Sequence, residues 1–229
     1  MARIFPHGSL NQVAPNAWQV EGSQSFPLKR NMTVYRLTDG RLVLYSVVAL
    51  DDAGMVALEA LGKPWLMIVP GSHTLDARFY KERYPQLLVA HEGKLPPTLA
   101  GIAIDGTPGE LLAGTGIEIM HAAGMKRPEL TLLLPGENGK ALVTCDILGR
   151  NGPRQSGVRG RILEVLGPPG GFFGVARIVK FRQVSDKRAL RGWIAALAER
   201  GDITTVLGSH GPPLISDVVA ALRQAVEKV

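Results

Sequence analysis

The sequence predicts a single α/β domain that spans residues 1–229. Short segments of strand length, rich in β-branched and aliphatic residues, occupy the start of the chain. From residue 51 onward such segments alternate with segments of helical periodicity, an alternation that is typical of α/β proteins. No repeat, low-complexity tract or linker divides the chain, and 229 residues with 45% hydrophobic content can bury a sizeable core.

The first half of the chain is predicted to begin with strands. Residues 1–16 look irregular, and three strands follow, over residues 17–21, 31–37 and 41–50. Asp39-Gly40 favours a tight hairpin turn because both residues tolerate a positive φ. The next element is a helix capped by Asp51 or Asp52, with three apolar positions facing the core: Val56, Leu58 and Leu61. Three further elements are expected: a strand at 64–70, a helix at 77–84 and a strand at 87–90.

The second half returns to strands and closes with helices. Residues 91–115 are rich in Gly and Pro and are predicted to be mostly loop. Strands are expected at three places: 117–120, 130–134 and 141–144. Residues 149–171 are rich in Gly, Pro and Arg, with a short helix at 161–166. The last elements are a helix at 185–200, a strand at 203–207 and a helix at 216–229 with Ser216 as its N-cap.

Two polar residues follow the ends of predicted strands. Asp146 comes after the apolar run at 141–144, and a carboxylate at the end of a buried strand is costly to leave without a partner. His210 comes after the run at 203–207, in a turn rich in Gly and Pro. Because sites in α/β sheets usually lie at such an edge, we predict that Asp146 and His210 come together in one site. Neighbours on a strand point to opposite faces, so Cys145 is predicted to be buried rather than to act as a nucleophile beside Asp146.

The composition excludes several classes of protein. No segment is apolar over a length that spans a membrane, and the start of the chain lacks the apolar region of a signal peptide. The single cysteine excludes an intramolecular disulfide and a cysteine-based zinc framework. These observations favour a soluble cytoplasmic protein, and they leave the oligomeric state open, a homo-oligomer included.

Taken in order, these segments resemble the metallo-beta-lactamase fold superfamily. The segments that match are the hairpin N-M-T-V-Y-R-L-T-D-G-R-L-V-L-Y-S, the strand P-W-L-M-I-V-P with the His-bearing turn after it, the run A-L-V-T-C-D-I-L and the late T-V-L-G-S-H-G-P-P. The start of the chain is similar to an uncharacterised branch whose members often have altered metal motifs. The resemblance implies a four-layer αββα sandwich of two mixed sheets flanked by helices. It also implies that Asp146 and His210 correspond to metal ligands.

The resemblance is incomplete at the superfamily's main ligand motif, His-x-His-x-Asp-His. The corresponding turn here is G-S-H-T-L-D-A-R, in which Asp76 matches the motif's Asp and His73 lies one residue off register. Three other residues stand at the histidine positions of the motif: Ser72, Thr74 and Ala77. A further ligand histidine of the family would fall near Lys126 or Arg127, and neither binds metal readily at neutral pH.

The resemblance therefore implies one metal ion at most. A dinuclear zinc hydrolase needs imidazole and carboxylate ligands for each metal and an open position for the activated water. The candidates for a single divalent metal such as zinc are four: His73, Asp76, Asp146 and His210. Two alternatives stay open: a metal-free, hydrogen-bonded pair of Asp146 and His210 in a degenerate pocket, and a different chemistry.

Two classes of function follow. One is a hydrolase of an unknown small-molecule substrate, with Asp146 and His210 as catalytic residues and a mononuclear or absent metal site. The other is a non-catalytic binding module that contacts a nucleic acid or another anionic partner through the Arg-rich segment, residues 150–191. Ten basic residues and two acidic ones lie in that segment, in a chain of formal charge +6. A solvated basic face is the simpler explanation of the same pattern.

Overall fold

The computed structural model describes residues 4–24, 28–71, 73–127, 129–150, 157–167 and 173–229. The chain divides into two compact units, Met1–Ile117 and Glu118–Val229, and each is described by itself. A single cooperative domain over residues 1–229 stays a prediction. In the described part of the chain, no helix combines the length and the hydropathy needed to cross a bilayer.

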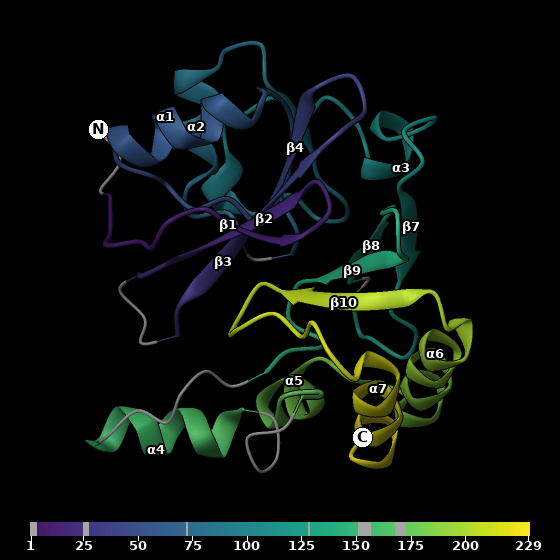
Figure 1. Ribbon diagram of the computed structural model, residues 1–229. Coiled ribbons are helices and arrows are strands. Elements are labelled where there is room, and N and C mark those ends of the chain that lie inside the picture. Colours follow the sequence, from purple (N-terminus) through teal and green to yellow (C-terminus); the bar gives the residue numbers. More distant parts are fainter. Residues whose placement is uncertain (1–3, 25–27, 72, 128, 151–156, 168–172) are drawn as a thin grey trace. The chain divides into compact units, whose positions relative to one another are not determined.

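The first unit contains a mixed six-stranded sheet in which every strand pairs with the next one in sequence. Figure 1 labels its first four strands. Its strands are β1 (Asn11–Ala14), β2 (Ala17–Gly22), β3 (Arg30–Arg36), β4 (Arg41–Tyr45), β5 (Lys63–Ile68) and β6 (Leu88–Ala90). The pairings from β1 to β4 are antiparallel, and β5 and β6 are added in parallel. Its helices are α1 (Asp52–Leu61), α2 (Ala77–Arg83), the 3-10 turn η1 (Pro97–Leu99) and α3 (Pro108–Leu111).

Helix α1 packs on this sheet through one face. The Asp51 carboxylate accepts a hydrogen bond from the Gly54 N–H at 2.8 Å, as the sequence predicts for the N-cap. Met55 and Leu58 are buried in the core of the unit. The prediction that Val56 faces the core is wrong, since its side chain is 65% exposed. The 3.6-residue period explains this, because a face that contains positions 55 and 58 turns position 56 outward.

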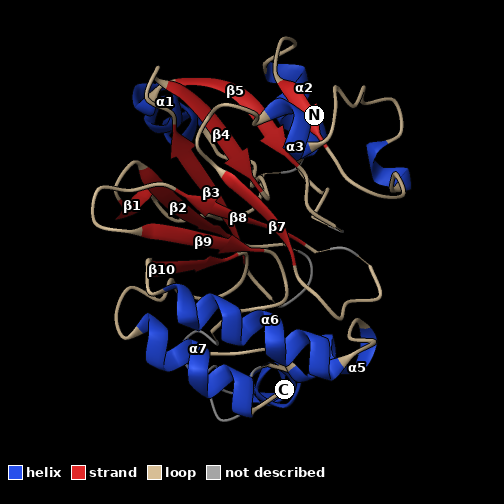
Figure 2. Cartoon of the chain, turned by 90° about the vertical axis from the view of Figure 1, so that its right-hand side faces the viewer, coloured by secondary structure: helices blue, strands red, loops and turns tan. Residues whose placement is uncertain are grey.

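The second unit contains a mixed four-stranded sheet of order β10-β9-β8-β7. Its strands are β7 (Glu118–His121), β8 (Leu130–Leu134), β9 (Lys140–Thr144) and β10 (Ile203–Gly208). Its helices are α4 (Gly157–Leu166), α5 (Arg177–Arg182), α6 (Lys187–Arg200) and α7 (Val218–Glu227). Figure 2 shows α6 and α7 side by side against this sheet, and Leu190, Ile194 and Leu222 join the core there. The predicted α/β class with two mixed sheets and flanking helices is confirmed.

Several predicted boundaries differ from the structure. The N-cap of α7 is Asp217 in a left-handed conformation, and no side chain caps the helix, so the prediction of Ser216 is wrong. Four short elements were not predicted: β1, η1, α3 and α5. Helix α4 begins four residues before the predicted helix. Each of the four missed elements has at most six residues, which is too few to show a clear hydrophobic period.

Candidate functional site

The structure brings Asp146 and His210 together within the second unit. Strands β9 and β10 pair in parallel, with Thr144 opposite Gly208. Asp146 lies two residues after Thr144, and His210 lies two residues after Gly208. His210 Nε2 lies 3.2 Å from Asp146 Oδ1, and the two side chains are 20% and 22% exposed. The pair is thus ordered by the sheet and still reached by solvent.

The two turns that present this pair are tied to each other. The Thr144 hydroxyl donates to the Leu148 carbonyl at 2.8 Å, which closes the turn around Asp146. The Ser209 N–H donates to the Thr144 carbonyl at 3.0 Å and so joins the second turn to the first. A side chain at Gly208 would place its Cβ 3.0 Å from the Leu148 carbonyl oxygen, so this close approach of two backbones favours glycine.

A second carboxyl group, Glu129, contacts the backbone that carries Asp146, and no local pattern in the sequence predicts it. Its Oε1 accepts hydrogen bonds from the N–H groups of Asp146 at 2.9 Å and Ile147 at 2.7 Å. Burial, with the charge of Asp146 adding to it, raises the pKa of Glu129 to about 8. Glu129 therefore anchors the backbone that carries Asp146 and holds a proton at neutral pH.

Cys145 takes no part in this chemistry. Its side chain is buried, as predicted. Burial raises the pKa of the thiol well above its usual range, and the charges of Asp146 and Glu129 act in the same direction. A thiol that stays protonated is a poor nucleophile.

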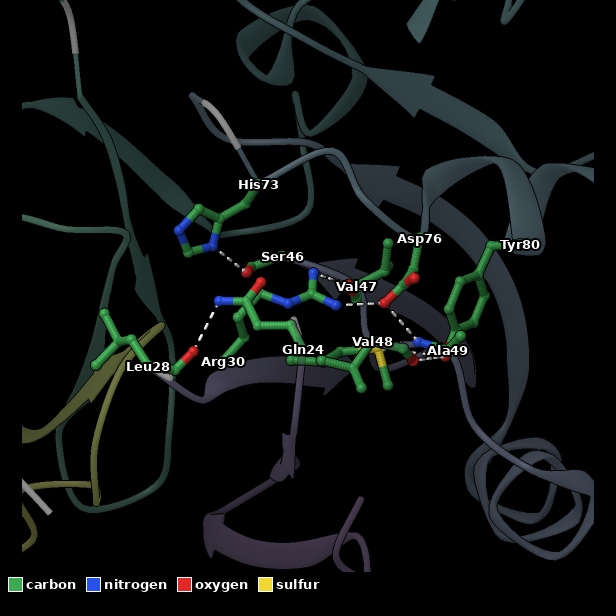
Figure 3. Close-up of polar contacts among 11 residues, drawn as sticks. Gln24, Leu28, Arg30, Ser46, Val47, Val48, Ala49, His73, Asp76 and Tyr80 are labelled. Atoms are coloured by element: carbon green, nitrogen blue, oxygen red, sulfur yellow. Dashed lines mark hydrogen bonds and ion pairs between the residues drawn. The ribbon is translucent and has the colours of Figure 1, made fainter. Parts of the chain in front are cut away.

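His73 lies in the first unit, where its partner is Ser46 (Figure 3). His73 Nδ1 and Ser46 Oγ are 2.7 Å apart, and both residues are buried. Ser46 directly follows β4 and has φ +57°, a left-handed conformation that costs a non-glycine residue about 1 kcal/mol or more. With Nδ1 engaged by the hydroxyl, Nε2 is the ring nitrogen on the side away from Ser46.

Asp76 also lies in the first unit, and its carboxylate is occupied by other groups. Its Oδ2 pairs with the Arg30 guanidinium and accepts a hydrogen bond from the Ala49 N–H at 3.0 Å. Two neighbouring residues of the altered motif, Thr74 and Ala77, have structural roles. Thr74 hydrogen bonds to the Thr98 hydroxyl, Ala77 is fully buried, and Ser72 lies outside the described residues.

Several solved structures of metallo-beta-lactamases are similar to this chain over almost its full length. The metallo-beta-lactamase FIM-1 from Pseudomonas aeruginosa, in its mono-zinc form, matches 99% of this chain over 96% of its own length at 12% identity, with a TM-score of 0.62. The metallo-beta-lactamase DIM-1 matches 98% over 99% of its own length at 13% identity, also with a TM-score of 0.62. A metallo-beta-lactamase from Pontibacter korlensis matches 96% over 99% at 12% identity and a TM-score of 0.59. The chain has the metallo-beta-lactamase fold. No protein-family model matches the sequence, and no curated protein is detectably similar to it.

On this metallo-beta-lactamase fold, the pair of Asp146 and His210 could take part in holding a divalent metal ion. Asp146 and His210 offer a carboxylate oxygen and an imidazole nitrogen, both of which zinc accepts, at a place that water reaches. The negative charge of Asp76 is already balanced by the Arg30 guanidinium. Lys126 and Arg127, near which the resemblance would put a further ligand histidine, are exposed basic residues.

Replacing Ser46 tests whether the hydroxyl fixes the imidazole of His73. In Ser46→Ala, we expect the His73 ring to lose its single tautomer, because the hydroxyl that engages Nδ1 is removed. Nitrogen-15 spectra of histidine-labelled protein report the tautomer, and five histidines give few signals. Ser46→Gly is the matched variant, since it removes the same hydroxyl and also relieves the positive φ. Unchanged His73 signals in both variants would contradict this role.

Proposed function

We propose that the protein is a hydrolase of a small-molecule substrate that uses a single divalent metal ion, such as zinc. The observation that supports this most is the solvent-reached pair of Asp146 and His210, at 3.2 Å, where the parallel strands β9 and β10 end. The mononuclear site is the part of the family's chemistry for which this sequence keeps suitable ligands.

The residues of the chain have distinct roles in this proposal. Zinc held by these residues would supply activation of water for hydrolysis near neutral pH. Asp146 supplies a carboxylate oxygen and His210 an imidazole nitrogen, while His73 stays a predicted third ligand through Nε2. Glu129 holds the backbone N–H groups at positions 146 and 147 and so fixes the direction of the Asp146 side chain.

The same two residues support a metal-free form of the reaction. Asp146 would orient the imidazole of His210, which would then remove a proton from water as a general base. Addition of a chelator separates the two mechanisms, since only the metal-dependent one loses activity.

Elemental analysis tests the proposal directly. Protein purified without chelator, with its tag removed, is expected to contain close to one equivalent of zinc, manganese or iron, or to acquire one on incubation with zinc. Ester, lactone and phosphodiester substrates are then screened in the presence and absence of chelator. A protein that neither holds metal after zinc incubation nor turns over any of these substrates would contradict the proposal.

A second candidate function is contact with an anionic partner through residues 150–191. The described part of this segment excludes residues 151–156 and 168–172. Burial lowers the pKa of Lys180, and so do three neighbouring cations: Lys187, Arg177 and Arg191. Crowded like charges of this kind are relieved when an anion such as a nucleic-acid phosphate binds among them.

Charge-removing variants test this second function. Arg188→Gln/Arg191→Gln removes two exposed positive charges. If the segment binds single-stranded RNA, we expect the dependence of log affinity on log salt to lose about two units of slope. Lys63→Gln/Lys94→Gln removes two exposed charges from the first unit and should leave the slope unchanged. Absence of binding at low salt, or equal losses in both variants, would contradict this function.

We further propose that the protein acts in the cytoplasm. The single cysteine is buried and without a disulfide, which is typical of proteins in a reducing compartment. Cell fractionation of the untagged protein, with antibody detection, checks this location.

A further inference from the structure

Arg30 and Asp76 form an ion pair that is almost completely buried in the first unit (Figure 3). Arg30 is 3% exposed and Asp76 is 5% exposed, although the two residues are 46 positions apart in sequence. A guanidinium and a carboxylate this deep each lose several kcal/mol of hydration, so neither is retained there by hydrophobic packing. The Arg30 Nε–H is buried without a hydrogen-bond partner among the described residues, which makes the arginine costlier still.

The Asp76 carboxylate does not cap its own helix, α2. Asp76 is the N-cap of α2, a position whose side chain usually accepts a hydrogen bond from the start of its own helix. No such bond is present, and the carboxylate instead contacts Arg30 and the Ala49 N–H. The Arg30 Nη1 also donates to the Val47 carbonyl at 3.1 Å. The two side chains thus bind both ends of residues 47–49, the segment directly after Ser46.

We propose that Arg30 is a permanent internal cation that takes the place of a metal ion as the partner of Asp76. This inference rests on the proposed function, and it explains why that function uses one metal ion. With Asp76 paired to Arg30, His73 remains the candidate ligand from the altered motif. A guanidinium carries a fixed positive charge and cannot be deprotonated in a protein. It therefore balances Asp76 under all conditions, and it accepts no lone pair, so it activates no water.

The test removes the cation and asks whether a metal can replace it. In Arg30→Met, the carboxylate of Asp76 is buried without a counter-ion. In chelator we expect its Tm to fall by about 10 °C, as for other broken buried ion pairs in a chain of this size. The control is Arg30→Met/Asp76→Leu, in which both charges are replaced by apolar side chains of similar size, and its Tm should lie closer to that of the unmodified protein.

Zinc is then added to each variant and the change in Tm is measured. We expect zinc, at about 100 times its Kd, to raise the Tm of Arg30→Met by about 5 °C more than that of the double variant, because only the single variant has a free carboxylate for the ion. An equal zinc effect in both would overturn the inference. If Arg30→Met does not fold in chelator, the comparison becomes refolding: zinc-dependent refolding supports the inference, and failure to refold in zinc as well as in chelator overturns it.

This comparison is independent of metal at Asp146 and His210, since those residues are present in both variants. If the proposed function fails, the unmodified protein and the double variant both lack zinc, while the difference between the single and double variants remains. If only the inference fails, the unmodified protein keeps its zinc and that difference disappears. Loss of zinc in a folded double variant would also overturn the inference, because it would make Asp76 a ligand.

Discussion

His210→Ala and Asp146→Ala are expected to lose bound metal and hydrolytic activity together. Each substitution removes one of the two donor groups that approach to 3.2 Å at the ends of β9 and β10. Loss of a direct ligand should weaken metal binding at least as much as loss of a residue that merely orients one, which costs about 10- to 100-fold. We therefore expect kcat/KM and metal affinity to fall by at least about 100-fold, measured by substrate turnover and by elemental analysis after dialysis.

His121→Ala is the matched control for this pair of variants. His121 is an exposed histidine on β7 of the same unit, so its removal changes the histidine content without touching the site. Metal content and turnover should be unchanged in this variant. The side chains of Asp146 and His210 are about four-fifths buried, so circular dichroism spectra must show that their alanine variants are folded. Folded variants with full metal content and turnover would remove both residues from the site.

The stability of the metal-free protein is expected to fall as the pH rises from about 5 to about 8, through Glu129. An unfolded glutamate loses its proton near pH 4.5, whereas the folded protein keeps it until about pH 8. Between those values the folded state binds more protons than the unfolded state. The contribution of Glu129 to the free energy of unfolding is therefore complete below pH 4.5 and is lost as the pH passes 8. A shift of this size corresponds to at most about 5 kcal/mol of unfolding free energy.

Glu129→Gln tests this pH dependence because the amide keeps an acceptor oxygen for the N–H groups of Asp146 and Ile147 but does not titrate. Urea denaturation in chelator, at each pH from 5 to 9, should show a flatter profile for the variant, which becomes the more stable protein at the alkaline end. Glu137→Gln changes an exposed glutamate of the same unit and should follow the unmodified protein. Parallel profiles for Glu129→Gln and the unmodified protein would show that Glu129 is ionised in the folded state.

The elements that the sequence predicted are those with a strong local signal. The cap at Asp51 and the Asp39-Gly40 turn need only neighbouring residues, and both are found in the structure. Val56 was placed wrongly because three apolar residues in a short helix fit more than one face. The metallo-beta-lactamase fold itself was predictable from the order of its segments, in spite of the missing histidines.

The site was predictable where strand ends identify it and unpredictable where partners are distant in sequence. Asp146 and His210 each follow an apolar strand, so the sheet edge could be inferred. Glu129 precedes its strand and accepts hydrogen bonds from backbone N–H groups 17 and 18 residues away. Every residue type except proline has such an N–H group, so the sequence carries no sign of these bonds. The pairing of Arg30 with Asp76 is a long-range contact of the same kind. Because of it, the Asp of the altered motif has an arginine side chain as its partner.

The sequential order of the first sheet has a consequence for biosynthesis. Each of its strands pairs with its neighbour in the chain, so every pairing closes a short loop and can form soon after the segment leaves the ribosome. In the second sheet, β9 ends at Thr144 and its parallel partner β10 begins only at Ile203, so this pairing must wait for a long intervening segment. We expect the turns that carry Asp146 and His210 to meet late in folding, only after the chain has been made through β10 and the turn that follows it.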